Sequence, residues 1–155
     1  MADVWFARSG GSLALYCRVA DQGMRRSAKW WDGSCMEVFG VAEPGDPIHQ
    51  LFLAPATPDE PARAMRLSEE ENASKANILP APEISFASWS FPGGYASAAL
   101  IPLAWWLKRA NAPERFLFEI AVSAGVDGHA FGRSALFGNL DASARSDGYA
   151  MAIYE

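Results

Sequence analysis

The sequence predicts an all-β protein, an antiparallel β-sandwich of the jelly-roll or immunoglobulin-like kind, with one short helix near residues 103–109. Two observations predict this fold class. Roughly eight short runs alternate apolar and polar residues, and turns rich in Gly and Pro separate them, with almost no helical periodicity. A chain of 155 residues can bury one hydrophobic core. This length predicts a single domain over residues 1–155, and no internal repeat is visible.

The chain begins with a predicted β-hairpin. Residues 4–8 and 13–20 are β-prone, and a Ser-Gly-Gly-Ser turn joins them. A polar connection leads to residues 34–39, whose strict alternation predicts a strand. Residues 48–53 predict the next strand, after a turn that contains Pro-Gly.

Residues 54–82 differ from the rest of the chain. Several prolines bracket the acidic run Glu69, Glu70 and Glu71, and large apolar residues are few. Such a segment cannot build a core of its own. We therefore predict a surface insert with at most one short helix, and expect it to be the internal segment that proteases cut first.

The second half of the chain returns to short strands. Trp105 and Trp106 anchor the predicted helix over 103–109, which an Asn-Ala-Pro sequence ends. The strands predicted around this helix are residues 84–91, 95–101, 116–122, 131–137 and 148–154.

The candidate functional residues gather around the strand at 34–39. Side-chain alternation places Met36 and Val38 on its core face and Glu37 on the opposite face, with Trp31 leading in from the preceding turn. An indole beside a fixed carboxylate can bind a sugar, because the ring covers the apolar C–H face of a pyranose while the carboxylate accepts hydrogen bonds from its hydroxyls. The alternative is an ordinary hydrophobic strand with a solvated glutamate. If this strand paired with the one at 13–20, Arg18 could meet Glu37.

Composition excludes several classes of partner. The formal net charge is −5 and no basic stripe is visible, which argues against a nucleic-acid-binding protein. No apolar run is long enough to span a membrane. The first residues do not have the pattern of a signal peptide, so an extracellular or periplasmic location is expected only if the chain is cut from a longer secreted protein.

Neither cysteines nor catalytic residues form a recognisable constellation. Cys17 shares a face with the core leucines of its strand, whereas Cys35 shares the Glu37 face, so we predict two free, reduced thiols. His49 and His129 have no metal ligands at suitable spacing. The sequence around Arg133 lacks the second glycine of a nucleophile elbow. We therefore predict no enzyme activity and no required cofactor, and a glycoside-active enzyme remains the third alternative.

Four short motifs, in order, resemble the family 9 carbohydrate-binding modules and the wider group of DOMON-like sandwiches. The first is the strand that ends in Val19-Ala20-Asp21, and the most specific is Trp31, five residues, then Glu37-Val38-Phe39. The others are Gly94-Tyr95 followed by Ile101-Pro102, and the run from Phe118 to Val122. The resemblance implies a β-sandwich over nearly the whole chain and a sugar held between two tryptophans by carboxylate, amide and arginine groups.

Carried over by position, the resemblance makes Trp31 one aromatic wall, Glu37 the carboxylate and Gln50 the amide. The arginine expected two residues after the glutamine is Phe52, and no aromatic residue stands near position 143, where the second tryptophan is expected. Trp30, Phe52 and Trp89 are candidates to supply the missing wall. Part of the environment for a structural calcium is also replaced.

These departures predict a non-catalytic carbohydrate-binding module with a weak or degenerate sugar site. The alternative is a DOMON-like structural or protein-interaction domain that has no sugar ligand. The partner is then a carbohydrate in the first case and another protein domain in the second.

Overall fold

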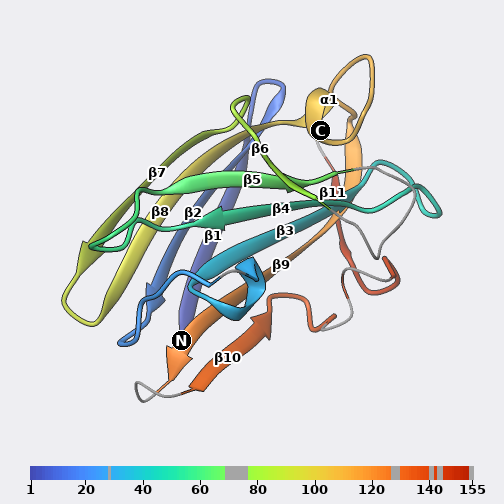
Figure 1. Cartoon of the computed structure of the whole chain (residues 1–155). Coiled ribbons are helices and arrows are strands. Elements are labelled where there is room, and N and C mark those ends of the chain that lie inside the picture. Colours follow the sequence, from blue (N-terminus) through green and yellow to red (C-terminus); the bar gives the residue numbers. More distant parts are fainter. Residues whose placement is uncertain (28, 69–76, 127–129, 140–141, 143–144, 154–155) are drawn as a thin grey trace.

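The computed structural model is a β-sandwich of two antiparallel sheets with little helix (Figure 1). It describes residues 1–27, 29–68, 77–126, 130–139, 142 and 145–153, except for the side chains of residues 31, 126, 130 and 131. The predicted fold class is thus confirmed. No helix in these ranges is long and apolar enough to cross a lipid bilayer.

The first sheet, sheet A, has four strands in the order β1-β2-β8-β7. Gly10, with φ of 57°, turns the chain between the two strands of the predicted hairpin. The bounds are β1 (Ala2–Ser9), β2 (Ser12–Ala20), β7 (Ser85–Phe91) and β8 (Gly94–Pro102).

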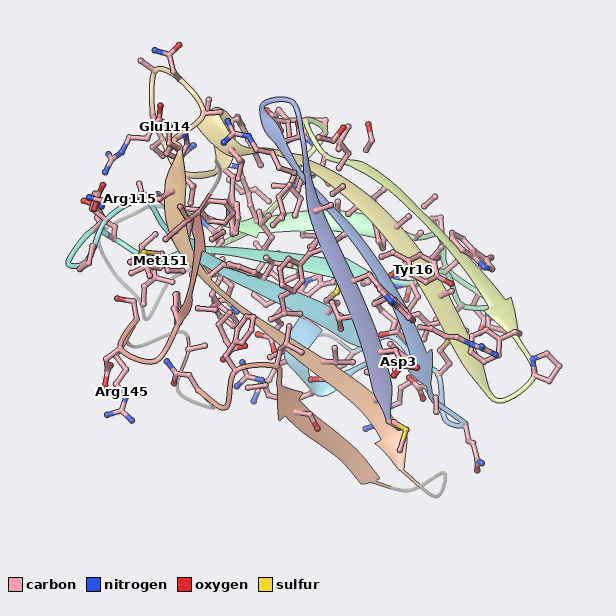
Figure 2. The ribbon with its side chains drawn as sticks, turned by 180° about the vertical axis from the view of Figure 1, so that it is seen from behind. Asp3, Tyr16, Glu114, Arg115, Arg145 and Met151 are labelled. Atoms are coloured by element: carbon pink, nitrogen blue, oxygen red, sulfur yellow. The ribbon has the colours of Figure 1, made fainter. Side chains whose placement is uncertain are left out.

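The outer face of sheet A is open to solvent. Asp3 and Tyr16, labelled in Figure 2, lie on this face. Trp5, Tyr16 and Trp89 form a row of exposed rings across it, with ring centroids 5.2 and 6.0 Å apart.

The second sheet, sheet B, has seven strands. Its main order is β10-β9-β3-β4-β5-β6, and β11 also pairs with β9. The bounds are β3 (Cys35–Val41), β4 (His49–Ala54), β5 (Arg63–Leu67), β6 (Ile78–Pro80), β9 (Arg115–Val126), β10 (Ala130–Ala135) and β11 (Ala150–Ile153).

The main core lies between the two sheets. Met36 and Val38 of β3 face it, as the alternation predicted, and so do Leu51 and Leu53 of β4. Sheet A contributes the alternate residues of β2, Leu13, Leu15, Cys17 and Val19, all at most 3% exposed. Cys17 therefore points between the sheets, whereas Cys35 packs on the opposite side of sheet B, and both thiols are free.

The predicted helix is confirmed as α1 (Leu103–Trp106), which closes one end of the sandwich (Figure 1). Trp106 is 2% exposed, and its indole packs against Gly40 of β3, where a Cβ atom would lie 2.5 Å from the ring. Its Nε1 donates a hydrogen bond to the backbone oxygen of His49. Burial of an indole of this kind stabilises a fold by roughly 3–5 kcal/mol, judged from Trp→Ala changes.

The description of residues 54–82 as an insert with at most one helix was wrong for its described part. β5 pairs with β4 in register Phe52↔Met65, and β6 pairs with β5. Backbone hydrogen bonds to an existing sheet edge allow strands to form here although the segment has few large apolar residues. Residues 69–76, which include the acidic run, lie outside the described residues.

The alternative interpretation, in which Glu37 is a solvated residue on an ordinary hydrophobic strand, was also wrong. All seven residues of β3 are buried, because further clusters cover the outer face of sheet B. One contains Phe39, Val41, Ala121, Ala142 and Tyr149, and the other contains Cys35, Phe52, Ala54 and Met65 with Trp30 beside them. Connecting segments therefore form a third layer over part of this sheet.

Candidate functional site

Glu37 lies at the centre of the covered outer face of sheet B. It is in register with Phe52 of β4 on one side and with Ala121 of β9 on the other. Its exposure is only 1%. A carboxylate at such a position requires polar partners, because an isolated buried charge is strongly unfavourable.

Gln50 supplies the first partner. Its Nε2 donates a hydrogen bond of 2.8 Å to Oε2 of Glu37. The two residues lie diagonally across β3 and β4, since Gln50 is in register with Phe39, two residues beyond Glu37. The structure thus brings together the carboxylate and the amide that the sequence pointed to.

Arg133 of β10 supplies the second partner. Its Nε lies 3.0 Å from Oε1 of Glu37, and Oε1 accepts no well-aligned hydrogen bond from the described residues, so the contact is an ion pair. The guanidinium crosses β9 where the side chains of Ala121 and Ser123 are short. It also lies 5.8 Å from the ring centroid of Phe39.

Arg133 is the member of this cluster that the sequence did not predict, since the residues around it resembled only an incomplete nucleophile elbow. The conditional pairing of Glu37 with Arg18 was wrong. β2 belongs to the other sheet, where the Arg18 guanidinium lies 4.7 Å from the ring centroid of Phe91. A lone cation on an alternating strand was the signal for Arg133, but only the strand order shows that it lies within reach of Glu37.

The surroundings of Glu37 shift the pKa of its carboxyl upward. Burial raises the pKa of the Glu37 carboxyl, and the charge of Arg133 and the hydrogen bond from Gln50 oppose this shift without cancelling it. The side chain of Arg133 remains about one third exposed, at 32%. The cluster therefore reaches solvent through its guanidinium.

Aromatic side chains near this cluster differ in how accessible they are. Trp30, in the short 3₁₀ helix η1 (Trp30–Asp32), is half-buried, and the Arg26 guanidinium lies 5.1 Å from its ring centroid. Phe52 is fully buried beside Cys35 and Met65, so its ring is not available as a second wall. Trp89 belongs to β7 of sheet A, the sheet opposite Glu37. The side chain of Trp31, predicted to be partly exposed near Glu37, lies outside the described residues, and so does position 143.

A second buried carboxylate, Glu119, holds the segment that follows β10. It is fully buried and accepts hydrogen bonds from the backbone N–H groups of Phe137 and Asn139. Asn139 in turn donates from Nδ2 to the backbone oxygens of Arg145 and Asp147. This arrangement orients the connection that covers the outer face near Phe39.

No group of three or more His, Cys, Asp or Glu side chains that could hold a metal ion is found among the described residues. The carboxylate of Asp21 accepts hydrogen bonds from Ser34 Oγ and from the N–H groups of Gly23 and Gly125. His129 lies outside the described residues. A structural calcium stays a prediction that these contacts do not test.

Comparison with known proteins identifies the fold. No protein-family model and no curated protein sequence matches the chain. Among solved structures, a family 9 carbohydrate-binding module from Caldicellulosiruptor kristjanssonii in complex with glucose has a TM-score of 0.65 and 13% identity, covering 99% of this chain and 76% of that one. A family 9 carbohydrate-binding module from the same organism in complex with cellotriose has a TM-score of 0.64 and 11% identity, covering 99% of this chain and 75% of that one.

A third structure, from Bacteroides uniformis, has a TM-score of 0.61 and 12% identity, with 99% and 78% of the two chains covered. At these identities the likeness concerns the fold, and it extends over nearly the whole of this chain. The chain has the fold of the family 9 carbohydrate-binding modules.

Proposed function

We propose that this protein is a non-catalytic carbohydrate-binding module whose weak sugar site lies around Glu37 on the outer side of sheet B. The observation that carries this proposal is the cluster in which Glu37 contacts both Gln50 and Arg133. Carboxylate, amide and guanidinium are the groups that bind vicinal hydroxyls, because together they offer strong acceptors and donors. The similar structures that hold glucose and cellotriose support the same ligand class for this fold.

The burial of the cluster supports low affinity. Glu37 and Gln50 are 1% and 8% exposed, so a sugar has to displace existing contacts before it reaches the carboxylate. Trp30 is the half-buried indole beside the site, and Trp31 is the second candidate for stacking. Loss of one aromatic wall removes roughly 1–3 kcal/mol, by analogy with base–aromatic stacking, or about one to two orders of magnitude in affinity.

The second candidate function is a structural or protein-interaction domain without a sugar ligand. The same burial favours it, because Gln50 and Arg133 already satisfy much of the charge of Glu37. Buried polar groups of this kind can serve specificity of packing alone.

Calorimetric titration with glucose, cellobiose and cellotriose separates the two functions. We expect weak, saturable binding that Trp30→Ala, Trp31→Ala and Arg133→Gln each reduce about tenfold or more. Trp89→Ala is the matched control, because Trp89 is an exposed indole, at 48%, on the opposite sheet. A chelator should leave the affinity unchanged, since the proposed site uses no metal.

The absence of saturable binding for all three sugars with correctly folded protein would favour the structural function. Binding that Trp89→Ala weakens, while Trp30→Ala and Arg133→Gln leave it unchanged, would overturn the proposed site and place the sugar on sheet A.

A further inference from the structure

A cavity of about 460 Å³ opens where β4 begins and β5 ends, against α1. Its lining includes Asp46, His49, Arg66, Trp105, Lys108 and Arg109. Gln50 is the one lining residue that it shares with the Glu37 cluster, and neither Glu37 nor Arg133 borders it. This volume is typical of small-molecule sites.

Arg66 stands at a position where alternation normally requires an apolar side chain. It is in register with Leu51, a core residue, so it lies on the inner face of sheet B near the sheet edge. It is partly buried, and no hydrogen bond or ion pair joins its guanidinium to any residue that the structure describes. Arg63 on the opposite face of the same strand, by contrast, lies 4.0 Å from Glu60. A partly buried guanidinium of this kind is unfavourable unless an anion reaches it.

Lys108 stands at a backbone position that favours glycine. Its φ is 53°, and it is the one non-glycine residue with positive φ in the described part of the chain. It follows α1, where Arg109 N–H bonds back to the oxygen of Ala104, the turn that commonly ends a helix with glycine. A lysine here is strained, and backbone strain concentrates at functional positions.

The side chain of Lys108 belongs to the same cavity. Its Nζ lies 5.6 Å from the ring centroid of Trp105, whose indole packs partly on the core and partly lines the cavity. Asp46 is the one acidic residue of the lining, and it forms an ion pair with Arg109. The described lining thus carries three cationic side chains, Arg66, Lys108 and Arg109, against one carboxylate, in a chain whose net charge is −5.

We propose that this cavity binds a small ligand that carries an oxyanion on a pyranose ring, of the class of acidic sugars. The oxyanion lies between Arg66, which can bind it through two N–H groups, and Lys108, while the apolar face of the ring packs on Trp105. This site is separate from the proposed neutral-sugar site and does not depend on it. Glucuronate and glucose 1-phosphate share the required chemistry and differ in the source of the anion.

The test is calorimetric titration of the whole chain at low ionic strength with glucuronate, glucose 1-phosphate and neutral glucose. We expect saturable binding of at least one anion, weakened about tenfold or more by Arg66→Gln. Arg63→Gln is the matched control, since it removes the same charge from the same strand on the other face. Lys108→Gly should weaken binding of the anion to a similar extent. The melting temperature of this variant should not fall, because glycine removes the backbone strain.

The outcomes separate this proposal from the proposed function. Arg133→Gln and Trp30→Ala should leave binding of the anions intact, whatever they do to glucose. Binding of glucuronate alone or of glucose 1-phosphate alone supports the proposal and identifies the anion. The proposal is overturned if neither anion binds, or if glucose binds with the same affinity and the same dependence on Arg66. It is also overturned if Arg63→Gln weakens binding of the anions as much as Arg66→Gln does.

Discussion

Glu37 illustrates what a single buried carboxylate does to this sandwich. Desolvation of the charged group opposes folding, and Gln50 and Arg133 recover only part of that free energy, since the pKa of Glu37 remains above its ordinary value of 4.5. A hydrophobic residue at this position would serve packing at least as well. The carboxylate is therefore better explained by recognition, or by a requirement for one specific arrangement of β3, β4 and β10, than by stability.

The first prediction follows from the sign of this pKa shift. A carboxyl whose pKa is raised on folding binds more protons in the folded state than in the unfolded state. Its contribution to the free energy of unfolding therefore grows as the pH falls through the raised pKa, and stops growing once the pH is below the ordinary pKa. The free energy of unfolding of the wild type minus that of Glu37→Gln should therefore rise as pH is lowered from about 8 to about 5. Urea unfolding followed by tryptophan fluorescence measures it. A difference that stays constant, or falls, would show that the Glu37 pKa is not raised.

At the scale of elements, the contact between β3 and α1 holds one end of the sandwich together. Gly40 leaves the space that the Trp106 ring fills, and the indole N–H bonds to the backbone at the start of β4. The helix is short, so its own hydrogen bonds contribute little. Its position depends on how well this one aromatic side chain fits against the strand.

The second prediction tests that fit. Gly40→Ala places a Cβ 2.5 and 2.6 Å from two ring carbons of Trp106, so we expect a loss of about 1–3 kcal/mol in the free energy of unfolding. Gly11→Ala is the control, because the nearest atom to its Cβ would be the Ala112 Cβ at an ordinary contact distance of 3.6 Å. Denaturant unfolding of both variants decides the matter. Equal stability of the two would mean that the Trp106 ring can shift without loss.

At the scale of the whole molecule, layering determines which groups meet. The two cysteines belong to different sheets, and sheet B separates the core cluster that holds Cys17 from the outer cluster that holds Cys35. Burial raises the pKa of both thiols, which lowers their reactivity further. Neither cysteine is placed to form a disulfide with the other.

The third prediction concerns these thiols. Titration of denatured protein with a thiol reagent should find two free groups per chain, and the native protein should react far more slowly, because both side chains are fully buried. A count of zero in the denatured protein would contradict the separation of the two cysteines by sheet B. Rapid reaction of both thiols in the native protein would contradict their burial.

Local patterns in the sequence were sufficient for the fold class and for the faces of the strands. The alternation at 34–39 correctly assigned Met36 and Val38 to the core, because side-chain direction in a strand has a period of two wherever the strand pairs. The same rule separated Cys17 from Cys35. The family resemblance, carried over by position, selected Glu37 and Gln50 together, and a hydrogen bond joins them in the structure.

Strand order and the third layer were decided only by the tertiary structure. Arg133 meets Glu37 because β10, β9 and β3 are neighbours and β9 carries short side chains there, which no local pattern encodes. The outer face of β3 is buried because segments distant in sequence fold over it, and strands β5 and β6 form because an edge of sheet B offers backbone partners. The sequence by itself thus determined the sandwich and the face on which Glu37 lies. Long-range pairing and coverage determined its partners, because they depend on contacts between distant parts of the chain.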